Sequence, residues 1–313
     1  MTAMLIKVHN LVKRYGSLLA LDHFNLQVEE GEIVGLLGPN GSGKTTAINC
    51  ILALLKYDKG RIELFGKPME PDTYESKQKI GIVMQNVALF DELQVLENVD
   101  FFCGLYVREP VRRRRLVDEA IDFVGLGEYR KFYPKKLSGG LLRRLNIACG
   151  IAHKPELLIF DEPTVGVDPQ SRNRILEGIK ELKRQGATVV YTSHYMEEVE
   201  QLCSRIVIMD QGRTLATGTT EELKAMIGNG ETINVETYLL DPARLAQIRQ
   251  LPGVTRAHYS QDRLSVHYRG GEHNLLGLLD YLKSQEISFN RVFSEQPTLN
   301  DVFLEITGRQ LRD

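Results

Sequence analysis

Apolar positions in the first part of the chain follow the two periods typical of strands and helices. Alternating or continuous apolar runs predict strands at residues 5–9, 24–28, 32–37, 157–160, 188–192 and 205–209. Apolar residues three and four positions apart predict helices between them, notably at 45–55 and 171–185. Strands that alternate with helices indicate an α/β domain with a mostly parallel sheet covered on both faces. Residues 88–150 show helical patterns alone, which predicts a helical insertion within this domain.

A change of pattern near residue 228 predicts a second, smaller domain. Gly228 and Gly230 indicate a linker. Beyond it, strands are expected at 232–238, 263–268 and 287–293, and helices at 243–251 and 274–285. We therefore divide the chain into an α/β domain over residues 1–228 and an α+β domain over residues 229–313.

The last predicted helix carries its own start and stop signals. Thr298 is followed three positions later by Asp301, which resembles a capping box, and Gly308 would end the helix. Its apolar residues fall on one helical face, namely Leu299, Val302, Phe303 and Ile306.

Composition narrows the class of protein. Of 313 residues, 42% are hydrophobic and 26% are charged, and the net charge is −2. This is typical of a soluble globular protein, and it offers no overall positive field for nucleic acid. The longest apolar runs, such as 50–55, are far shorter than the ~20 residues that a membrane span needs. The first ten residues show no signal-peptide pattern, and the four cysteines form no CxxC pair, so we expect buried thiols and a reducing compartment.

A glycine-rich segment between a predicted strand and a predicted helix points to a phosphate site. Gly38-Pro-Asn-Gly-Ser-Gly-Lys-Thr45 fits the pattern GxxxxGK[ST] in the context that this motif requires. Glycines let the backbone N–H groups turn toward phosphate, the helix start adds a favourable dipole, and Lys44 adds a charge. An ordinary glycine turn would rarely match every position. The residues expected to bind a nucleoside triphosphate are Gly38, Pro39, Asn40, Gly41, Ser42, Gly43, Lys44, Thr45 and Thr46.

Two carboxylates follow a buried strand in Leu157-Leu-Ile-Phe-Asp-Glu-Pro163. Active-site groups gather at the carboxyl ends of strands in open α/β sheets, so Asp161 and Thr45 are expected to hold Mg²⁺. Glu162 can polarise an attacking water as a general base. Asp-Glu-Pro alone would fit a solvated pair at the start of a loop, and the phosphate loop favours the catalytic interpretation.

The order of three motifs is similar to that of a known family. Leu137-Ser-Gly-Gly140 precedes the Asp161-Glu162 strand, and the phosphate loop precedes both. This order resembles the ATP-binding subunit of an ABC transporter. The resemblance implies a P-loop ABC ATPase fold, in which a parallel core sheet carries an N-terminal antiparallel β part and a helical insertion. It also implies ATP and Mg²⁺ as ligands.

The resemblance assigns roles to further residues. Tyr15 matches the aromatic that stacks on adenine, and Gln85 matches the glutamine that binds Mg²⁺ and senses the membrane partner. Ser138, Gly139 and Gly140 match the signature loop that caps ATP bound by the other subunit. Asp168 matches the loop that crosses the dimer interface, and His194 matches the histidine that contacts the γ-phosphate. Each alone has an ordinary structural explanation, such as core packing of the tyrosine or a hydrogen-bonded loop histidine.

Three positions, in two motifs, depart from the family pattern. Leu141 stands where many members have Gln, and Val165 and Val167 stand where Ser and Leu are frequent. Leu is ordinary at the first position in the subgroup that has Arg-Arg following, so we expect ATP hydrolysis to survive. Because Asp168 itself is present, the two valines put only the fine packing of the interface in doubt.

The C-terminal segment suggests a subfamily. Residues 296–308 resemble the end of ATPases that serve ABC-2 type exporters of drug-like, lipid-like or other amphipathic cargo. The resemblance implies a homodimer, or a heterodimer with a related ATPase, bound at the cytoplasmic face of the cell membrane to separate permease subunits. No nucleic-acid partner is expected. A soluble ABC ATPase on ribosomes or DNA, or a sensory module that binds ATP without transport, remains the alternative. Against the first, the chain has one cassette and no heptads.

Overall fold

The computed structural model describes residues 3–227, 230–238, 240–269, 274–295 and 297–307. The chain divides into two compact units, with the change from one to the other at Thr219 and Thr220. The predicted linker at residues 228 and 229 lies outside the described residues. The second unit begins earlier than the predicted boundary because α8 (Thr220–Met226) contacts the last helix, α11 (Leu299–Thr307).

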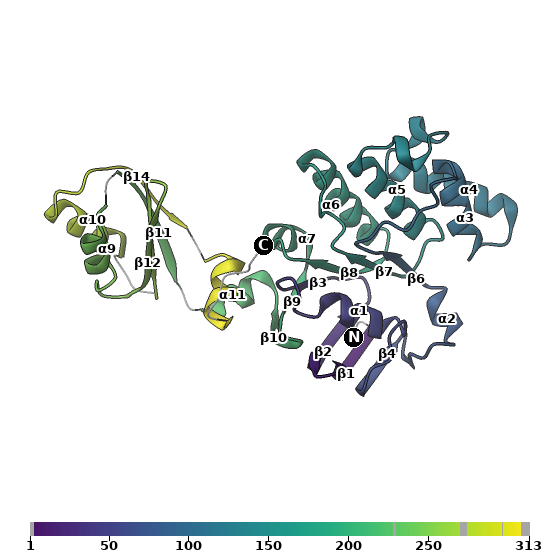
Figure 1. Ribbon diagram of the computed structural model, residues 1–313, viewed down its shortest axis with the longest axis horizontal. Coiled ribbons are helices and arrows are strands. Elements are labelled where there is room, and N and C mark those ends of the chain that lie inside the picture. Colours follow the sequence, from purple (N-terminus) through teal and green to yellow (C-terminus); the bar gives the residue numbers. More distant parts are fainter. Residues whose placement is uncertain (1–2, 228–229, 239, 270–273, 296, 308–313) are drawn as a thin grey trace. The chain divides into compact units, whose positions relative to one another are not determined.

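The first unit contains two sheets (Figure 1). One is antiparallel, in the order β2-β1-β4-β5. Its strands are β1 (Met4–Tyr15), β2 (Leu18–Glu29), β4 (Lys59–Leu64) and β5 (Lys67–Pro68). The expected N-terminal antiparallel part is therefore confirmed, although β1 and β2 are much longer than the apolar alternation predicts.

The other sheet has six strands in the order β10-β9-β3-β8-β7-β6, and all but β10 run parallel. These strands are β3 (Ile33–Leu37), β6 (Ile80–Val83), β7 (Leu157–Asp161), β8 (Thr188–Ser193), β9 (Arg205–Asp210) and β10 (Arg213–Gly218). Every residue of β3, β7 and β8 is buried, as continuous apolar runs predict. The sequence did not predict β6 and β10, which lie at the two edges.

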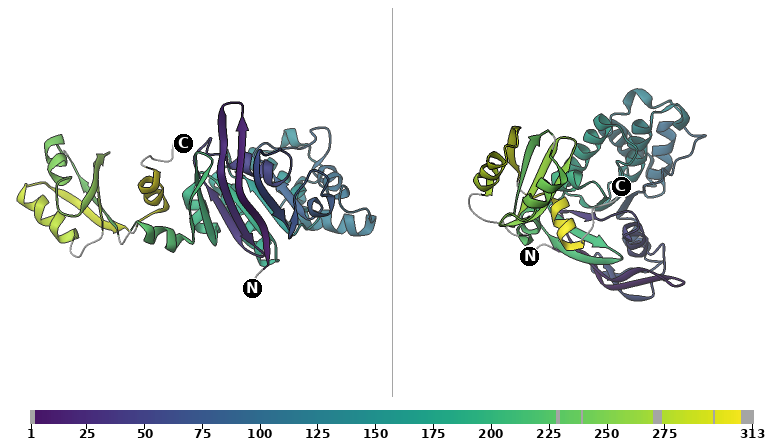
Figure 2. Two further views of the ribbon diagram at one scale, coloured as in Figure 1. Left: turned by 90° about the horizontal axis from the view of Figure 1, so that it is seen from below. Right: turned by 60° about the vertical axis from the view of Figure 1, so that its left-hand side comes forward.

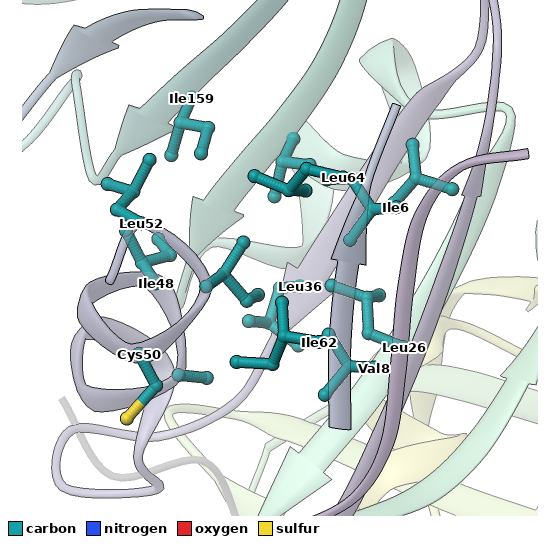
Figure 3. Close-up of a cluster of buried hydrophobic side chains, with 14 of the residues drawn as sticks. Ile6, Val8, Leu26, Leu36, Ile48, Cys50, Leu52, Ile62, Leu64 and Ile159 are labelled. Atoms are coloured by element: carbon teal, nitrogen blue, oxygen red, sulfur yellow. The ribbon is translucent and has the colours of Figure 1, made fainter. Parts of the chain in front are cut away.

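Helices cover this sheet and join it to the antiparallel one. They are α1 (Lys44–Ile51), α2 (Tyr74–Lys77), α6 (Pro169–Arg184) and α7 (Met196–Leu202). Figure 3 shows Ile48 and Leu52 at α1 facing strands of both sheets in one buried cluster. Removal of this apolar surface from water stabilises the arrangement and holds the start of α1 in place.

The predicted helical insertion is confirmed, since the described residues 88–150 contain helices and turns but no strand. It comprises α3 (Val95–Gly104), α4 (Pro110–Phe123), two short 3₁₀ turns and α5 (Gly139–Ile151), which contact one another. Buried Asn98 donates to the carbonyls of Phe90 and Leu93 and so fixes the segment that leads into α3.

The second unit has the element order β-α-β-β-α-β, flanked by α8 and α11 (Figure 2). Its elements are β11 (Glu231–Thr237), α9 (Pro242–Ile248), β12 (Val254–Ser260), β13 (Arg263–Tyr268), α10 (Asn274–Ser284) and β14 (Phe289–Glu295). The antiparallel sheet has the order β12-β13-β11-β14, and apolar residues of α9 and α10 pack on it. The sequence missed β12, because only Ala257 of that strand is buried.

The remaining expectations concern the last helix, the cysteines and the absence of membrane spans. Thr298 N–H donates to Asp301 Oδ2 at 2.8 Å and Asp301 N–H donates to Thr298 Oγ1 at 3.3 Å, which confirms the capping box. Gly308, the expected stop, lies outside the described residues. The four cysteines are buried free thiols, as expected. Within the parts of the chain that the structure describes, none of the helices has the length and apolar character that a membrane crossing requires.

Candidate nucleotide site

The glycine-rich loop lies between β3 and α1 and needs glycine for two different reasons. Gly41 and Gly43 have φ of 81° and 105°, a region that side chains with Cβ rarely adopt. At Gly38, a Cβ would lie 2.2 Å from the carbonyl oxygen of Met209, so the loop passes directly against β9. Gly43 caps α1 without a side chain, which leaves the first N–H groups of the helix to an external acceptor.

Lys44 is buried at the centre of this loop. Its Nζ donates to the carbonyls of Gly38 at 2.8 Å and Pro39 at 3.1 Å, and it lies 3.2 Å from Glu162 Oε1. The ammonium group is therefore held on the inner side of the loop by backbone oxygens and one carboxylate. Nearby, Ser42 Oγ is buried without a hydrogen-bond partner, which fits a loop built to receive an oxyanion.

An oxygen-rich group forms where β7 and β8 end beside α1. Asp161 is fully buried, and its two oxygens accept from Thr45 Oγ1 at 3.0 Å and from Thr192 Oγ1 at 2.6 Å. Among the described residues, no group of three or more His, Cys, Asp or Glu side chains is arranged to hold a metal ion by itself. Mg²⁺ binds through one or two carboxylates together with substrate phosphates and water, so a single aspartate beside a hydroxyl fits this ion.

Glu162 directly follows and lies between a cation and an imidazole. Its Oε1 faces Lys44, and its Oε2 lies 3.4 Å from Nδ1 of His194, which is buried without a hydrogen bond. The backbone of Glu162 has a φ of 47°, which is unusual for a residue with a side chain. Its N–H donates to Thr192 Oγ1 at 2.9 Å. Strained backbone that neighbouring contacts hold in place is typical of functional sites.

A cavity of about 1020 Å³ opens beside these groups. Of the residues predicted to bind nucleotide, it is lined by Tyr15, Asn40, Gly41, Gly43, Lys44, Thr45, Thr46, Gln85 and Glu162. Tyr15 is half exposed at the cavity, where its ring can receive a base. The structure therefore brings together the aromatic, the phosphate loop, the glutamine and the carboxylate from four separate parts of the chain.

The cavity has a second wall that the sequence did not reveal. The turn between β9 and β10 contributes Gln211 and Gly212, and β2 contributes Ala20. Gly212 N–H donates to Ser42 O at 2.9 Å, and a Cβ on Gly212 would lie 2.6 Å from Ala20 O. The Gln-Gly pair marks a turn in the sequence, but nothing in its spacing places that turn against the phosphate loop.

An ion pair between β2 and β10 stabilises this second wall of the cavity. Asp22 on β2 accepts from Nε of Arg213 at 2.6 Å and lies 2.7 Å from Nδ1 of His23. The hydrogen bonds from His23 and Arg213 hold the pKa of Asp22 below its usual value. The carboxylate is therefore charged at neutral pH and keeps β10 against β2.

The signature residues form a separate group. Ser138 caps α5 by accepting from Leu141 N–H at 3.3 Å. A Cβ on Gly140 would lie 2.3 Å from Ser171 Oγ and 3.0 Å from Asp168 Oδ2, so this glycine packs against the start of α6. Ser138, Gly139, Gly140 and Asp168 are all described, and none of them lines the nucleotide cavity of the same chain.

Asp168 caps α6 in the same way. Its Oδ1 accepts from Ser171 N–H at 2.9 Å, and this backbone hydrogen bond lowers the pKa of Asp168. The two loops that the family resemblance places at a dimer interface therefore lie side by side, each at the start of a helix.

One further residue links the helix that carries the signature residues to the segment of Gln85 at the cavity. Arg143 of α5 is buried, and its guanidinium donates to the carbonyls of Met84 at 2.9 Å and Gln85 at 2.8 Å. Burial lowers its pKa. The sequence showed Arg143 only as part of a basic pair after the signature, with no signal that it binds the backbone at Gln85.

Known proteins share both units of this chain. Residues 21–165 match the family described as ABC transporter, and residues 218–307 match the ATP-binding protein DrrA1-3-like C-terminal domain. The linearmycin resistance ATP-binding protein LnrL of Bacillus subtilis is 40% identical over 311 residues, which cover 99% of this chain and all of that protein. The chain belongs to the ABC transporter ATP-binding proteins.

Other relatives and solved structures agree with this assignment. The daunorubicin resistance ATP-binding protein DrrA3 of Streptomyces coeruleorubidus is 36% identical, covering 98% of this chain and 97% of that protein. The Nod factor export ATP-binding protein I of Cupriavidus metallidurans is 33% identical over the whole of both chains. A dimeric bacterial ABC transporter cassette, MJ0796, superposes with a TM-score of 0.64 and 30% identity, covering 68% of this chain and 98% of that one.

These findings confirm the predicted ABC ATPase fold and the resemblance on which it was based. MJ0796 is also known in a post-hydrolysis state with ADP and Pi, at a TM-score of 0.63 and 29% identity. As a member of this family, the ABC ATPase described here binds nucleotide and hydrolyses ATP.

Proposed function

We propose that this ABC ATPase is the energy-providing subunit of an ABC-2 type exporter and drives efflux of an amphipathic, drug-like or lipid-like compound. The observation that carries the hydrolytic part is the placement of Glu162 between Lys44 and His194 beside the phosphate loop. Export is supported by full-length relatives named for resistance and export, and by the match of the C-terminal unit to DrrA-type proteins.

In this proposal the cavity orders ATP from base to γ-phosphate. Tyr15 stacks on adenine, and the N–H groups from Gly38 to Thr46 together with Lys44 surround the phosphates. Thr45, Gln85 and Asp161 hold Mg²⁺, which supplies charge neutralisation to the phosphates when bound. Tyr15, Lys44, Thr45 and Gln85 line the cavity, and Asp161 accepts a hydrogen bond from Thr45 Oγ1 at 3.0 Å.

Hydrolysis requires an oriented water and a base. The Glu162 carboxylate accepts a proton from the water, and Lys44 and His194 on either side keep the carboxylate oriented. Thr192 holds both Asp161 and the backbone of Glu162, so the metal-binding and proton-accepting groups keep a fixed separation.

A second subunit completes the site. Ser138, Gly139 and Gly140 would cap the ATP of the opposite chain, with Asp168 beside them at the interface. Their exclusion from the cavity of their own chain, and the dimeric relative, support this arrangement. We infer a homodimer, or a heterodimer with a related ATPase, peripheral to the inner face of the cell membrane and bound to an integral membrane permease, without nucleic acid.

Reconstitution tests the proposal. The ATPase is expressed together with a candidate ABC-2 type permease, and the complex is placed in inverted vesicles with candidate amphipathic compounds. ATP-dependent accumulation inside the vesicles, lost with Glu162→Gln, is expected. ATP turnover by a protein that binds no permease and leaves transport unaffected would instead favour a sensory or ribosome-associated ATPase.

A further inference from the structure

One buried carboxylate has no part in the reaction proposed above. Glu198 lies in α7, four residues after His194, and only 3% of its surface is exposed. Burial of a carboxylate is costly unless strong partners surround it. Its hydrogen-bond and ion-pair partners lie in or beside the two segments that carry the proposed catalytic residues Glu162 and His194 and the interface residue Asp168.

One oxygen of Glu198 accepts three hydroxyl hydrogen bonds. Oε2 accepts from Thr164 Oγ1 at 2.8 Å, from Tyr191 Oη at 2.7 Å and from Ser193 Oγ at 3.1 Å. Hydrogen bonds to an ionised acceptor are about twice as strong as neutral ones. The carboxylate therefore joins two other segments to α7, namely the loop of Thr164 and strand β8.

The other oxygen faces a cation. Oε1 lies 3.3 Å from Nε of Arg172 in the first turns of α6. The Arg172 guanidinium lies over the ring of Tyr195 at 4.9 Å, and that ring contacts the ring of His194 at 4.1 Å. A continuous series of contacts thus leads from Glu198 through Arg172 and Tyr195 to His194.

Three of these partners also hydrogen-bond within the segment that carries a proposed catalytic or interface residue. Thr164 lies between Glu162 and Asp168, and its carbonyl accepts from Val167 N–H at 3.2 Å. Ser193 directly precedes His194, and its Oγ accepts from Tyr195 N–H at 2.9 Å. Arg172 N–H donates to Asp168 O at 2.9 Å.

We propose that Glu198 is a positioning residue that ties the Glu162–Asp168 loop to the His194 turn, so that the two loops move as one when the γ-phosphate is bound or released. This inference rests on the proposed roles of Glu162, His194 and Asp168. It makes the interface loop of one subunit responsive to the state of the nucleotide in its own cavity, through a group that touches neither ATP nor the partner.

A set of three single substitutions tests the proposal. Replacing Glu198 itself would leave Arg172 and three hydroxyls without their acceptor, so its partners are changed instead. Thr164→Val removes one hydroxyl without changing side-chain size, and Thr164→Ser keeps the hydroxyl. Tyr191→Phe removes a hydrogen bond to the same oxygen from a buried position within β8, three residues before His194.

The expected results separate positioning from stability. Thr164→Val lowers kcat about tenfold with KM for ATP unchanged, and Thr164→Ser restores kcat to within about twofold. Tyr191→Phe lowers the Tm at least as much as Thr164→Val but keeps kcat within about twofold. In a Glu162→Gln background, Thr164→Val also lowers the yield of ATP-bound dimer in size-exclusion chromatography.

Two results would overturn the proposal while leaving the assigned function intact. They are wild-type kcat in Thr164→Val, and equal loss of kcat in Thr164→Val and Tyr191→Phe, which would show a general stability effect. The assigned roles are tested by a separate variant: if Glu162→Gln alone retains wild-type turnover, the base assignment is wrong, and the inference about Glu198 is overturned with it.

Discussion

The starts of α1 and α5 are both glycine-rich helix ends, but they differ in their caps and in the groups that surround them. At α1, Gly43 caps the helix without a side chain, and Lys44, Asp161 and Glu162 gather around it. At α5, Ser138 caps the helix with its own hydroxyl, and the neighbouring groups are the exposed loop around Asp168 and Ser171. Both present N–H groups that favour an anion.

The difference shows which of the two can act alone. The α1 end has the Lys44 ammonium group, the oxygens of Thr45 and Asp161 and the Glu162 carboxylate within one chain, and it lines a cavity large enough for a nucleotide. The α5 end has none of these in contact with it in the described structure. A helix end of this kind can add affinity for a phosphate held elsewhere, which agrees with the proposal that α5 completes the site of a second subunit.

Glu162→Gln is expected to have the largest effect on the complete site. Loss of the general base lowers ATP turnover about 10²- to 10⁴-fold, while Lys44 and the loop retain ATP. An ATP-bound dimer accumulates, which size-exclusion chromatography with ATP detects. Glu156→Gln, at a surface ion pair with Lys79, is the matched control. Normal turnover together with monomer alone would contradict the assignment.

Lys44→Ala acts on binding. The substitution removes a charge-assisted contact worth about 1.5–3 kcal/mol, so ATP affinity falls about 10- to 100-fold. Isothermal titration calorimetry measures this change, with Lys59→Ala, at the exposed first residue of β4, as the control. Unchanged affinity would show that the ammonium group is held by Gly38, Pro39 and Glu162 for structural reasons alone.

Mixing two inactive variants tests whether the α5 end serves the other chain. A Lys44→Ala chain and a Ser138→Arg chain each form inactive homodimers. In a mixed dimer one composite site carries both changes and the other carries neither, so at equal ratio roughly a quarter of all sites are intact. ATPase rate against mixing ratio should therefore pass through a maximum. A zero response, with subunit exchange confirmed by labelled chains, would mean that both elements serve the same nucleotide.

The smallest expected effect is a change in stability that tests how Gly140 packs at the α5 end. In Gly140→Ala the new Cβ would lie 2.8 Å from Ser171 Cβ and 3.0 Å from Asp168 Oδ2, and such overpacking costs about 1–3 kcal/mol. Gly139→Ala meets only Gly166 O at 3.8 Å and should change stability by less than about 0.5 kcal/mol. Urea unfolding without nucleotide compares the two. Equal losses would show that Gly140 is not packed against α6.

Much of the site could be predicted because its residues are neighbours in sequence. The phosphate loop, the Asp161-Glu162 pair and Ser138 each lie in a short motif at the end of a strand or the start of a helix, and local spacing reveals such positions. Edge strands were harder to predict. In β12 and β10 most side chains face solvent or are half-buried, so the apolar alternation is too weak to indicate a strand.

Sequence alone determined the two-part organisation, the α/β class, the helical insertion and the glycine-rich motif that we propose binds phosphate. Tertiary structure decided which distant groups meet. Thr45 and Asp161 are 116 positions apart, Arg143 and Met84 are 59 apart, and Thr164 and Glu198 are 34 apart, yet each pair is in hydrogen-bond contact. Periodicity reports only which face of an element is buried. The strand order places β7 beside β8, and the start of α1 contacts the end of β7 through Thr45 and Asp161. Burial then requires each polar group enclosed there to find a partner.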